Sequence, residues 1–457
     1  MPQKCILHSG AVMPPARVVV CTREFGYHPR MHASKDTSAD AVYVRRLVVL
    51  FGLAYFAQGL GQAGGLISQP LNYYLKSGLG LNPAQVSEYL AILTLPWVIK
   101  PLYGLVSDYL PLFGYRRKTW LILVNMVAAL GFLWVSGLTE VGTIIAALTL
   151  TAFGIASSDV IIDALMVENG ERTGMIARFQ GVQWFWFKIA AILTALTGGY
   201  LASMFEPATA FHLAASITML APLAVIVASY LVLREERTVI SFAQFRETSQ
   251  SLLLALKSPT LQITAAFLAL WCFSPAFGTP LYYHMVDNLG FEQHYIGQLN
   301  ALTAIGAVGG AYIFLRVFAD KTVVYRVVFS LCAGIVGVLS YLALAQPQDY
   351  SAALAIPLNI FVGMVAQIGT LTILTMAANA CPPKAAGFAF AVLMSLYNGV
   401  EQFSAIIGSQ LYEHVFERQL APLLWVAALS FMLCFALVPL LRRLETGAPG
   451  PHAVAAD

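Results

Sequence analysis

Five charged residues lie inside long apolar stretches of this sequence, and their chemistry stands out. They are Lys100, Asp159, Asp163, Lys188 and Glu401. A charge at the centre of a membrane-spanning helix costs about 2.5 to 3.5 kcal/mol on insertion scales, so such charges are usually paired or line a wet cavity. Lysines can neutralise an anion and carboxylates can bind protons. These residues therefore predict a polar interior that binds a charged solute or protons.

Lys100 and Asp159 are expected to lie at the same depth. At a rise of 1.5 Å per helical residue, Lys100 is about 12 Å above Asp108 and Asp159 is about 13 Å above Glu168. We therefore predict an ion pair between Lys100 and Asp159. A structural and a functional role are equally compatible with this pair.

Asp163 follows Asp159 by four residues, so both carboxylates share one helix face. Without cations nearby they would repel each other, and one would take up a proton. By depth, Asp163 matches Arg178, and we expect both to join a cluster with Asp108 and the basic run at residues 116–118. The predicted gate of ion pairs comprises Lys100, Asp108, Arg116, Arg117, Asp163 and Arg178.

Lys188 and Glu401 are predicted to occupy corresponding depths. Each lies fourteen residues after a glycine that opens its apolar run, Gly174 and Gly387 respectively, which places both near the middle of the bilayer. A proton-coupled carrier needs a buried carboxylate whose proton affinity changes with access. Glu401 is the first candidate for that role and Asp159 the second. A fixed pair of Glu401 with a group of the second span is the alternative.

The composition requires a lipid environment. Of 457 residues, 58% are hydrophobic and 11% are charged, which is less than half the charge of an average soluble domain. A net charge of +3 without a basic cluster argues against nucleic-acid binding. The six cysteines form no C-x-x-C pair, and no nucleotide-binding, metalloprotease, nucleophile-elbow or haem motif is present. We expect no metal, no cofactor and no enzymatic activity.

Twelve apolar runs are long enough to cross about 30 Å of hydrocarbon as helices. They lie near residues 47–69, 86–106, 119–138, 142–166, 175–203, 208–233, 259–283, 295–317, 323–345, 351–378, 386–410 and 420–441. Twelve basic residues, from Arg116 to Lys384, fall on the side of the N-terminus, whereas Lys76 and Arg418 fall on the other. The positive-inside rule then predicts that both termini are cytoplasmic, in the plasma (inner) membrane.

The longest charged interruption divides the runs into two sets of six. The expected organisation is a disordered leader (1–46, with Met31 as a possible start), two six-helix bundles (47–233 and 259–441), a loop between them (234–258) and a tail (442–457). The halves share a pattern, because Pro70-Leu71, Tyr73 and Leu79-Gly80 recur as Pro280-Leu281, Tyr283 and Leu289-Gly290. Parallel six-span halves are the organisation of major facilitator transporters.

Two motifs resemble one family within that superfamily. The first run is Pro96-Trp97-Val98-Ile99-Lys100-Pro101, followed by Gly104-Leu105-Val106-Ser107-Asp108 and Arg116-Arg117-Lys118; the second is Ser157-Ser158-Asp159-Val160-Ile161-Ile162-Asp163. Both look like the folate–biopterin transporter family. A third, weaker resemblance covers Tyr282-Tyr283 through Leu289-Gly290-Phe291. The resemblance implies a major facilitator fold and uptake of folates, biopterin or related pteridines.

The same resemblance implies that the first, fourth, seventh and tenth spans line a central cavity, flanked by the fifth and eleventh. Gln58, Gln62 and Gln69 are spaced to share one stripe of the first span. A pterin edge donates two parallel hydrogen bonds, which an amide or carboxylate accepts, and folate would also need a cation. The candidate substrate-binding residues are Gln58, Gln62, Asp159, Gln183, Trp184, Lys188, Trp271, Asn359, Gln367, Asn398 and Gln402.

The sequence predicts a monomeric, proton-coupled carrier for a small pteridine-like solute. Two alternatives stay open. One is a major facilitator porter for another small organic solute, such as a sugar or peptide. The other is a non-transporting assembly factor or receptor with the same fold. Retention of Lys188 and Glu401 at the midplane favours transport over the second alternative.

Overall fold

The computed structural model describes residues 37–173, 175–235, 237, 257–318, 320–381 and 386–447. Most of the expected leader and inter-bundle loop, and the last ten residues of the tail, lie outside these ranges. The described residues from 44 to 447 group as one compact unit. One expectation is corrected at the N-terminus, because residues 37–46 belong to the first helix and not to a leader.

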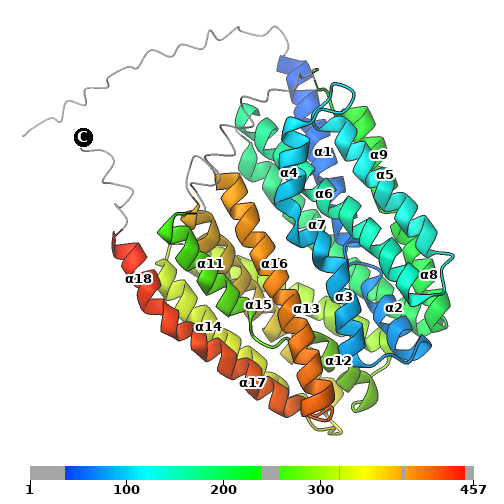
Figure 1. The fold of residues 1–457 in the computed structure, drawn as a ribbon, viewed down its shortest axis with the longest axis vertical. Helices are drawn as coiled ribbons and strands as arrows, with labels where there is room; N and C mark the ends of the chain where they lie inside the picture. The colour runs from blue at the N-terminus through cyan, green and yellow to red at the C-terminus, as the bar shows by residue number, and fades with distance from the viewer. Residues whose placement is uncertain are drawn as a thin grey trace, which may run out of the picture. The chain divides into compact units, whose positions relative to one another are not determined.

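The first half of the chain forms helices that run up and down the unit (Figure 1). Their bounds are α1 (Thr37–Gly61), α2 (Ser68–Tyr73), η1 (Tyr74–Gly78), α3 (Pro83–Val98), α4 (Lys100–Tyr109), α5 (Lys118–Val135), α6 (Val141–Thr173), α7 (Ile176–Met204), α8 (Pro207–Thr218) and α9 (Leu220–Val232).

The second half continues the pattern. Its helices are α11 (Pro259–Cys272), α12 (Gly278–Asp287), α13 (Gln293–Ile313), η2 (Phe314–Phe318), α14 (Val323–Ser340), η3 (Tyr341–Leu344), α15 (Ser351–Ala380), α16 (Ala386–Gln410), η5 (Leu411–Val415), α17 (Leu420–Leu433), η6 (Cys434–Leu437) and α18 (Val438–Gly447).

Eleven of the twelve expected spans are helices long and apolar enough to cross a membrane, counted over the described residues. The seventh is divided into α11 and α12 by residues 273–277. Pro275 has no N–H and disfavours helix at the residue before it. The break is held by α16: the backbone N–H of Ala276 donates to the Ser404 carbonyl at 3.2 Å, and the Ser404 hydroxyl donates to the Ser274 carbonyl.

The first span is broken as well, which corrects the expected glutamine stripe. Helix α1 ends at Gly61, and α2 begins only at Ser68. Gln58 lies in α1 and Gln62 in the intervening turn, whereas Gln69 donates to the backbone carbonyl of Gln293 at 2.5 Å. A periodicity of 3.6 assumes continuous helix, so it cannot place residues beyond such a break.

The internal repeat marks the same turn in both halves. Gly80 and Gly290 follow the half-helices that end the first and seventh spans, and their φ angles are 66° and 65°. Glycine adopts positive φ without a steric penalty. The residue after each glycine donates back to the preceding helix, Leu81 to Leu75 and Phe291 to Met285. The sequence pattern therefore corresponds to one duplicated turn.

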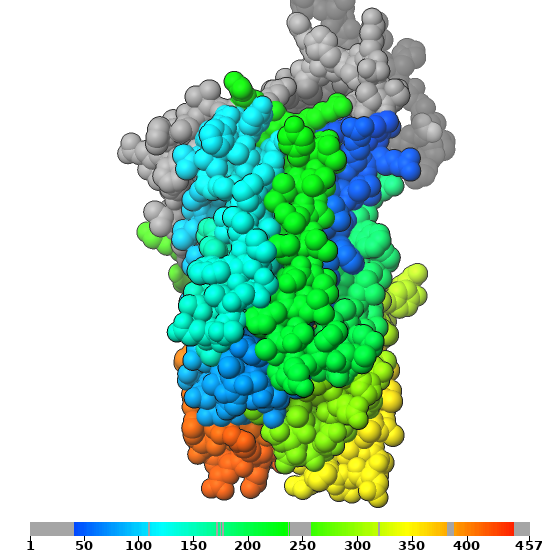
Figure 2. Space-filling model, turned by 90° about the vertical axis from the view of Figure 1, so that its right-hand side faces the viewer, coloured from blue at the N-terminus to red at the C-terminus, as the bar shows by residue number. Residues whose placement is uncertain are grey.

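The outer surfaces are apolar. Helices α5 and α9 lie side by side on the face shown in Figure 2, in cyan and green. Their exposed residues include Leu123, Leu130, Leu133, Leu223 and Val227. Such a surface suits lipid contact and not water.

The halves meet most closely where α7 crosses α13. A Cβ on Gly199 would lie 2.7 Å from the Cα of Gly297, so only glycine fits there. Nearby, Lys76 pairs with Asp287 at 2.5 Å, and the hydroxyls of Ser87 and Ser409 are 2.6 Å apart. We call this end of the unit, where α2, α3, α12 and α13 meet (Figure 1), the closed end, and the opposite end, which carries residues 109–118, the basic end.

Candidate functional site

Lys100 is the first residue of α4, directly after the break in the second span. Pro101 follows it in the first turn of α4, where a missing N–H is tolerated. The Lys100 ammonium lies 2.5 Å from Asp159 Oδ2 in α6 and 4.3 Å from the centre of the Trp97 ring. The structure thus contains the ion pair that the sequence predicts, between side chains that are 19% and 7% exposed.

Asp163 lies one turn further along α6 and faces α1. Its carboxylate accepts a hydrogen bond from the Tyr55 hydroxyl. Asp159 and Lys100 are its charged neighbours. The predicted match with Arg178 is wrong, because the Arg178 side chain is exposed near the start of α7. Depth along a helix does not specify the direction in which a side chain points, and Asp163 points toward α1.

A small pocket adjoins the Asp159 carboxylate. It is lined by Ala54, Tyr55, Ala57, Gln58, Asn125, Ile155, Ser158, Asp159, Ile162 and Val225. The space inside it is small. That is room for about one water. The Asn125 amide donates to the Ser158 hydroxyl at 2.9 Å, so the polar wall on this side is ordered.

Lys188 links the two halves near the middle of the unit. Its ammonium donates to the side-chain carbonyl of Gln367 in α15 at 3.0 Å. The rings of Trp184 and Phe187 have their centres 6.0 Å from the ammonium. Trp184 is 43% exposed, so an aromatic face next to a cation is accessible.

Glu401 is an exposed carboxylate on α16. It has no hydrogen-bond or ion-pair partner among the described residues. Its charge acts on the Cys272 thiol at the end of α11 and on Tyr397 one turn earlier in α16. The side chain thus faces α11, the helix next to the break in the seventh span.

The other candidates in the C-terminal half differ in surroundings. Asn359 is buried, donates to the Ala355 carbonyl and accepts from Thr303 and Tyr341, so it is engaged within that half. Asn398 donates weakly to the Trp97 carbonyl at 3.4 Å. Gln402 and Trp271 are half-buried, and the Trp271 ring packs edge-on against Phe431.

Gln183 in α7 is fully buried, yet both polar atoms of its amide lack a partner among the described residues. A buried amide without hydrogen bonds costs about 1 to 3 kcal/mol. The nearby aromatic pair Phe51 and Phe179 is packed edge to face. Gln183 therefore carries hydrogen-bonding capacity that this arrangement of helices does not use.

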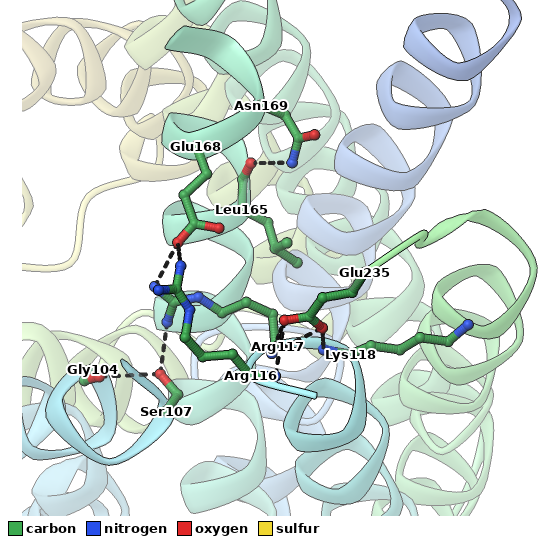
Figure 3. A network of polar contacts seen from close by, with 9 residues as sticks. All are labelled: Gly104, Ser107, Arg116, Arg117, Lys118, Leu165, Glu168, Asn169 and Glu235. Carbon is green, nitrogen blue, oxygen red and sulfur yellow. Dashed lines mark hydrogen bonds and ion pairs between the residues drawn. The ribbon is translucent and has the colours of Figure 1, made fainter. Parts of the chain in front are cut away.

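A polar network occupies the basic end (Figure 3). Arg116 and Arg117 both donate to Glu168 at the end of α6, at 2.5 and 2.9 Å. Arg117 also donates to the Ser107 hydroxyl at 2.8 Å. The side chain of Asp108, the acidic partner expected for this cluster, lies outside the described part of the structure.

Glu235 completes this network and was not predicted. Its carboxylate accepts hydrogen bonds from the backbone N–H groups of Arg116, Arg117 and Lys118, at the start of α5 (Figure 3). A carboxylate there satisfies free N–H groups and complements the helix dipole. The sequence could indicate only part of this network. Glu168 lies at the same end of the spans as the basic run, but Glu235 comes from the segment after α9, and its distance along the chain gives no sign of the contact.

These contacts place an ion pair around Lys100 within the N-terminal half, and a cation bonded to an amide around Lys188 between the halves. The model for the BT1 family matches residues 58–446. The chain belongs to the BT1 family.

Curated relatives cover most of the chain. The folate–biopterin transporter of Synechocystis sp. is 29% identical over 415 residues, which are 86% of this chain and 81% of that protein. Folate transporter 1 of Plasmodium falciparum is 21% identical over 354 residues, covering 74% of this chain and 68% of its own length. These relatives identify this BT1 family member as a transporter.

Solved structures with a similar fold are transporters as well. The D-xylose–proton symporter has a TM-score of 0.70 at 12% identity and covers 87% of this chain and 97% of its own. The nucleoside transporter NupG has a TM-score of 0.65 at 14% identity and covers 88% of this chain and 99% of its own. At such identities the likeness shows the fold alone, which is the major facilitator fold. This BT1 family member is thus a multi-pass membrane protein that carries a small molecule.

Proposed function

We propose that this protein is a secondary active transporter that moves a pteridine-like anion by alternating access, coupled to protons. The observation that carries this proposal is the hydrogen bond between Lys188 and Gln367 beside the exposed Trp184. It sets a cation, an amide and an aromatic face between the two halves. The names of the relatives point to folates and biopterin as the substrate class.

The chemistry of these groups fits such a substrate. The amide oxygen of Gln367 can accept from the amino edge of a pterin, while the Lys188 ammonium neutralises a carboxylate of a folate tail. Trp184 offers a stacking surface. The free amide of Gln183 and the side chains of Asn398, Gln402 and Trp271 are further candidates, and Gln58, Gln62 and Asp159 would serve from the N-terminal half.

Alternating access would use the two ends of the unit. The closed end is sealed by cross-half contacts, including Lys76–Asp287 and the Gln69–Gln293 pair. Separation of the halves at that end would require those contacts to break. The basic end would be the cytoplasmic side with both termini, in the plasma membrane, because basic loops are retained inside. The network around Arg117 would brace α4 and α6 there in a monomeric carrier.

Proton coupling would use a carboxylate exposed to the interior. Glu401 is our first candidate, because it has no partner among the described residues and lies next to the break in the seventh span. Asp159 is the second candidate, and it would have to leave Lys100 to take up a proton.

Purified protein in liposomes tests the proposal directly. Labelled folate or biopterin should accumulate when the exterior is acidified, and Lys188→Met should reduce folate accumulation by at least about tenfold, the equivalent of one charged contact. Glu401→Gln should remove the acid-driven component while exchange of substrate across the membrane continues. Absence of uptake of every pteridine tested would eliminate the proposed substrate class.

A further inference from the structure

The N-terminal half places two carboxylates next to a single ammonium group. Asp159 and Asp163 lie one turn apart on the same face of α6, and Lys100 is bonded to Asp159 at 2.5 Å. Asp163 accepts a hydrogen bond only from the neutral hydroxyl of Tyr55 in α1. Among the described residues, no ammonium or guanidinium lies within 4 Å of Asp163, the limit for an ion pair. Two carboxylates therefore share one cation.

The groups that face Asp163 can be named for each neighbouring helix. Helix α3, which also packs against α6, carries one charged residue, Glu88, which is exposed and accepts a hydrogen bond from Gln410. Helix α1 contributes Tyr55, α4 contributes Lys100 and also carries Tyr103, and α6 itself contributes Asp159. The polar residue that α5 brings to this region is the neutral Asn125. Helix α7 carries Arg178 and Lys188, but Arg178 is exposed and Lys188 is bonded to Gln367.

A negative charge on Asp163 in addition to that on Asp159 is energetically unfavourable. Two negative charges about 6 Å apart, the spacing of neighbours on one helix face, repel each other strongly where little water screens them. Lys100 can offset this repulsion for one carboxylate only, and it already donates to Asp159. Uptake of one proton removes the unpaired charge, leaving Lys100, Asp159 and Asp163 neutral as a group.

We propose that Asp163 is a proton-binding site of the N-terminal half, with Tyr55 as the residue that positions its carboxylate. This inference deepens the proposed function, on which it rests for the role of the proton in transport. The proton binds a carboxylate oxygen and is released from the same oxygen, so no other reactant is required. Tyr55 can donate to Oδ1 in both states, while the proton occupies Oδ2.

The location suits access from the interior. Tyr55 and Asp159 line the pocket that has room for about one water, and Asp163 is bonded to the first and one turn from the second. A water in that pocket could pass a proton to the carboxylate. A movement of α1 relative to α6 would break the Tyr55 contact and change the proton affinity of Asp163.

Infrared titration of the purified protein in lipid nanodiscs tests this site without any substrate. The stretching band of a protonated carboxylic acid should titrate in the unmodified protein, and one component should be lost in Asp163→Asn. That component should persist in the matched variant Glu401→Gln, whereas Asp159→Asn should move its titration to lower pH, because it removes the neighbouring charge and frees Lys100 to pair with Asp163. Persistence of the complete band in Asp163→Asn, or loss of the same component in Glu401→Gln, would overturn the proposal.

Transport gives the second readout. Asp163→Asn keeps an oxygen that accepts from Tyr55, so the fold should be retained, which a thermal unfolding curve close to that of the parent would verify. Acid-stimulated uptake should fall at least about tenfold while substrate exchange remains. Acid stimulation of unchanged size would count against Asp163. If the parent protein transports no pteridine, the proposed function fails, whereas the infrared titration still decides on Asp163.

Discussion

Lys188 of α7 donates a hydrogen bond to Gln367 of α15 at 3.0 Å, so a cation of the N-terminal half is held by an amide of the C-terminal half. The acceptor in this bond, the amide oxygen of Gln367, carries no charge. A substrate carboxylate would be a stronger partner for the same ammonium, because charge-assisted hydrogen bonds are roughly twice as strong as neutral ones. The geometry therefore permits displacement of Gln367 by an anion.

Gln367→Glu should turn this contact into an ion pair between the halves. The substrate anion must then compete with a carboxylate, so the apparent affinity for folate should fall at least about tenfold. Gln367→Leu is the matched control, since it removes the acceptor and leaves the Lys188 cation available. Affinity for folate, measured by thermal shift and by uptake, should be higher in Gln367→Leu than in Gln367→Glu, and the reverse order would contradict the role of Lys188.

Lys100→Met and Asp159→Asn test the buried ion pair. Each single change leaves one buried charge without its partner, a loss of about 3 to 5 kcal/mol. The double variant leaves no orphan from this pair, so its loss of stability should be smaller than the sum of the two. Thermal unfolding in detergent and in nanodiscs measures this coupling. A double variant whose loss equals the sum of the two single losses would show that the two residues act separately.

The sequence predicted the spans and the Lys100–Asp159 pair because both depend on distance along a helix. Depth at 1.5 Å per residue is reliable wherever the helix is continuous. The glutamine stripe was wrong for the opposite reason, since the turn between Gly61 and Ser68 interrupts the first span. Asp163 was assigned to the wrong partner because depth does not give rotation about the helix axis.

Contacts between the halves could not be predicted from the sequence. The pairs Lys188–Gln367 and Lys76–Asp287 join residues 179 and 211 positions apart. Nothing local in the chain specifies which helices of two bundles face each other. The duplicated turn at Gly80 and Gly290 was recognisable, because a glycine with positive φ leaves a local pattern.

Glu235→Gln tests the capping of α5 by the segment after α9. Three backbone N–H groups, of Arg116, Arg117 and Lys118, donate to this carboxylate. Gln keeps an acceptor but loses the charge, whereas Glu235→Ala loses both. We expect losses of stability that increase from Gln to Ala, within the range of about 0.5 to 2 kcal/mol typical of helix caps. Equal unfolding temperatures for the parent and Glu235→Ala would show that the cap contributes nothing.

Gly199→Ala tests the closest approach of the halves. The added Cβ would lie 2.7 Å from the Cα of Gly297 and 3.0 Å from the Gln293 carbonyl, and both are backbone atoms that cannot rotate away. The closed end should therefore separate, exposing residues that the cross-half contacts now cover. A cysteine placed at Ser87, which is 2% exposed, should react with a water-soluble thiol reagent faster in the Gly199→Ala background.

Gly181→Ala supplies the control for this last experiment. Gly181 lies on the same helix, α7, but an added Cβ there meets no atom within 4 Å. Its effect on thiol reactivity should be negligible, because Gly→Ala in an exposed helical position changes only local helix propensity, by about 1 kcal/mol. If both variants expose the cysteine equally, a general loosening of α7 explains the result. If only Gly199→Ala does so, the contact with Gly297 keeps the closed end shut.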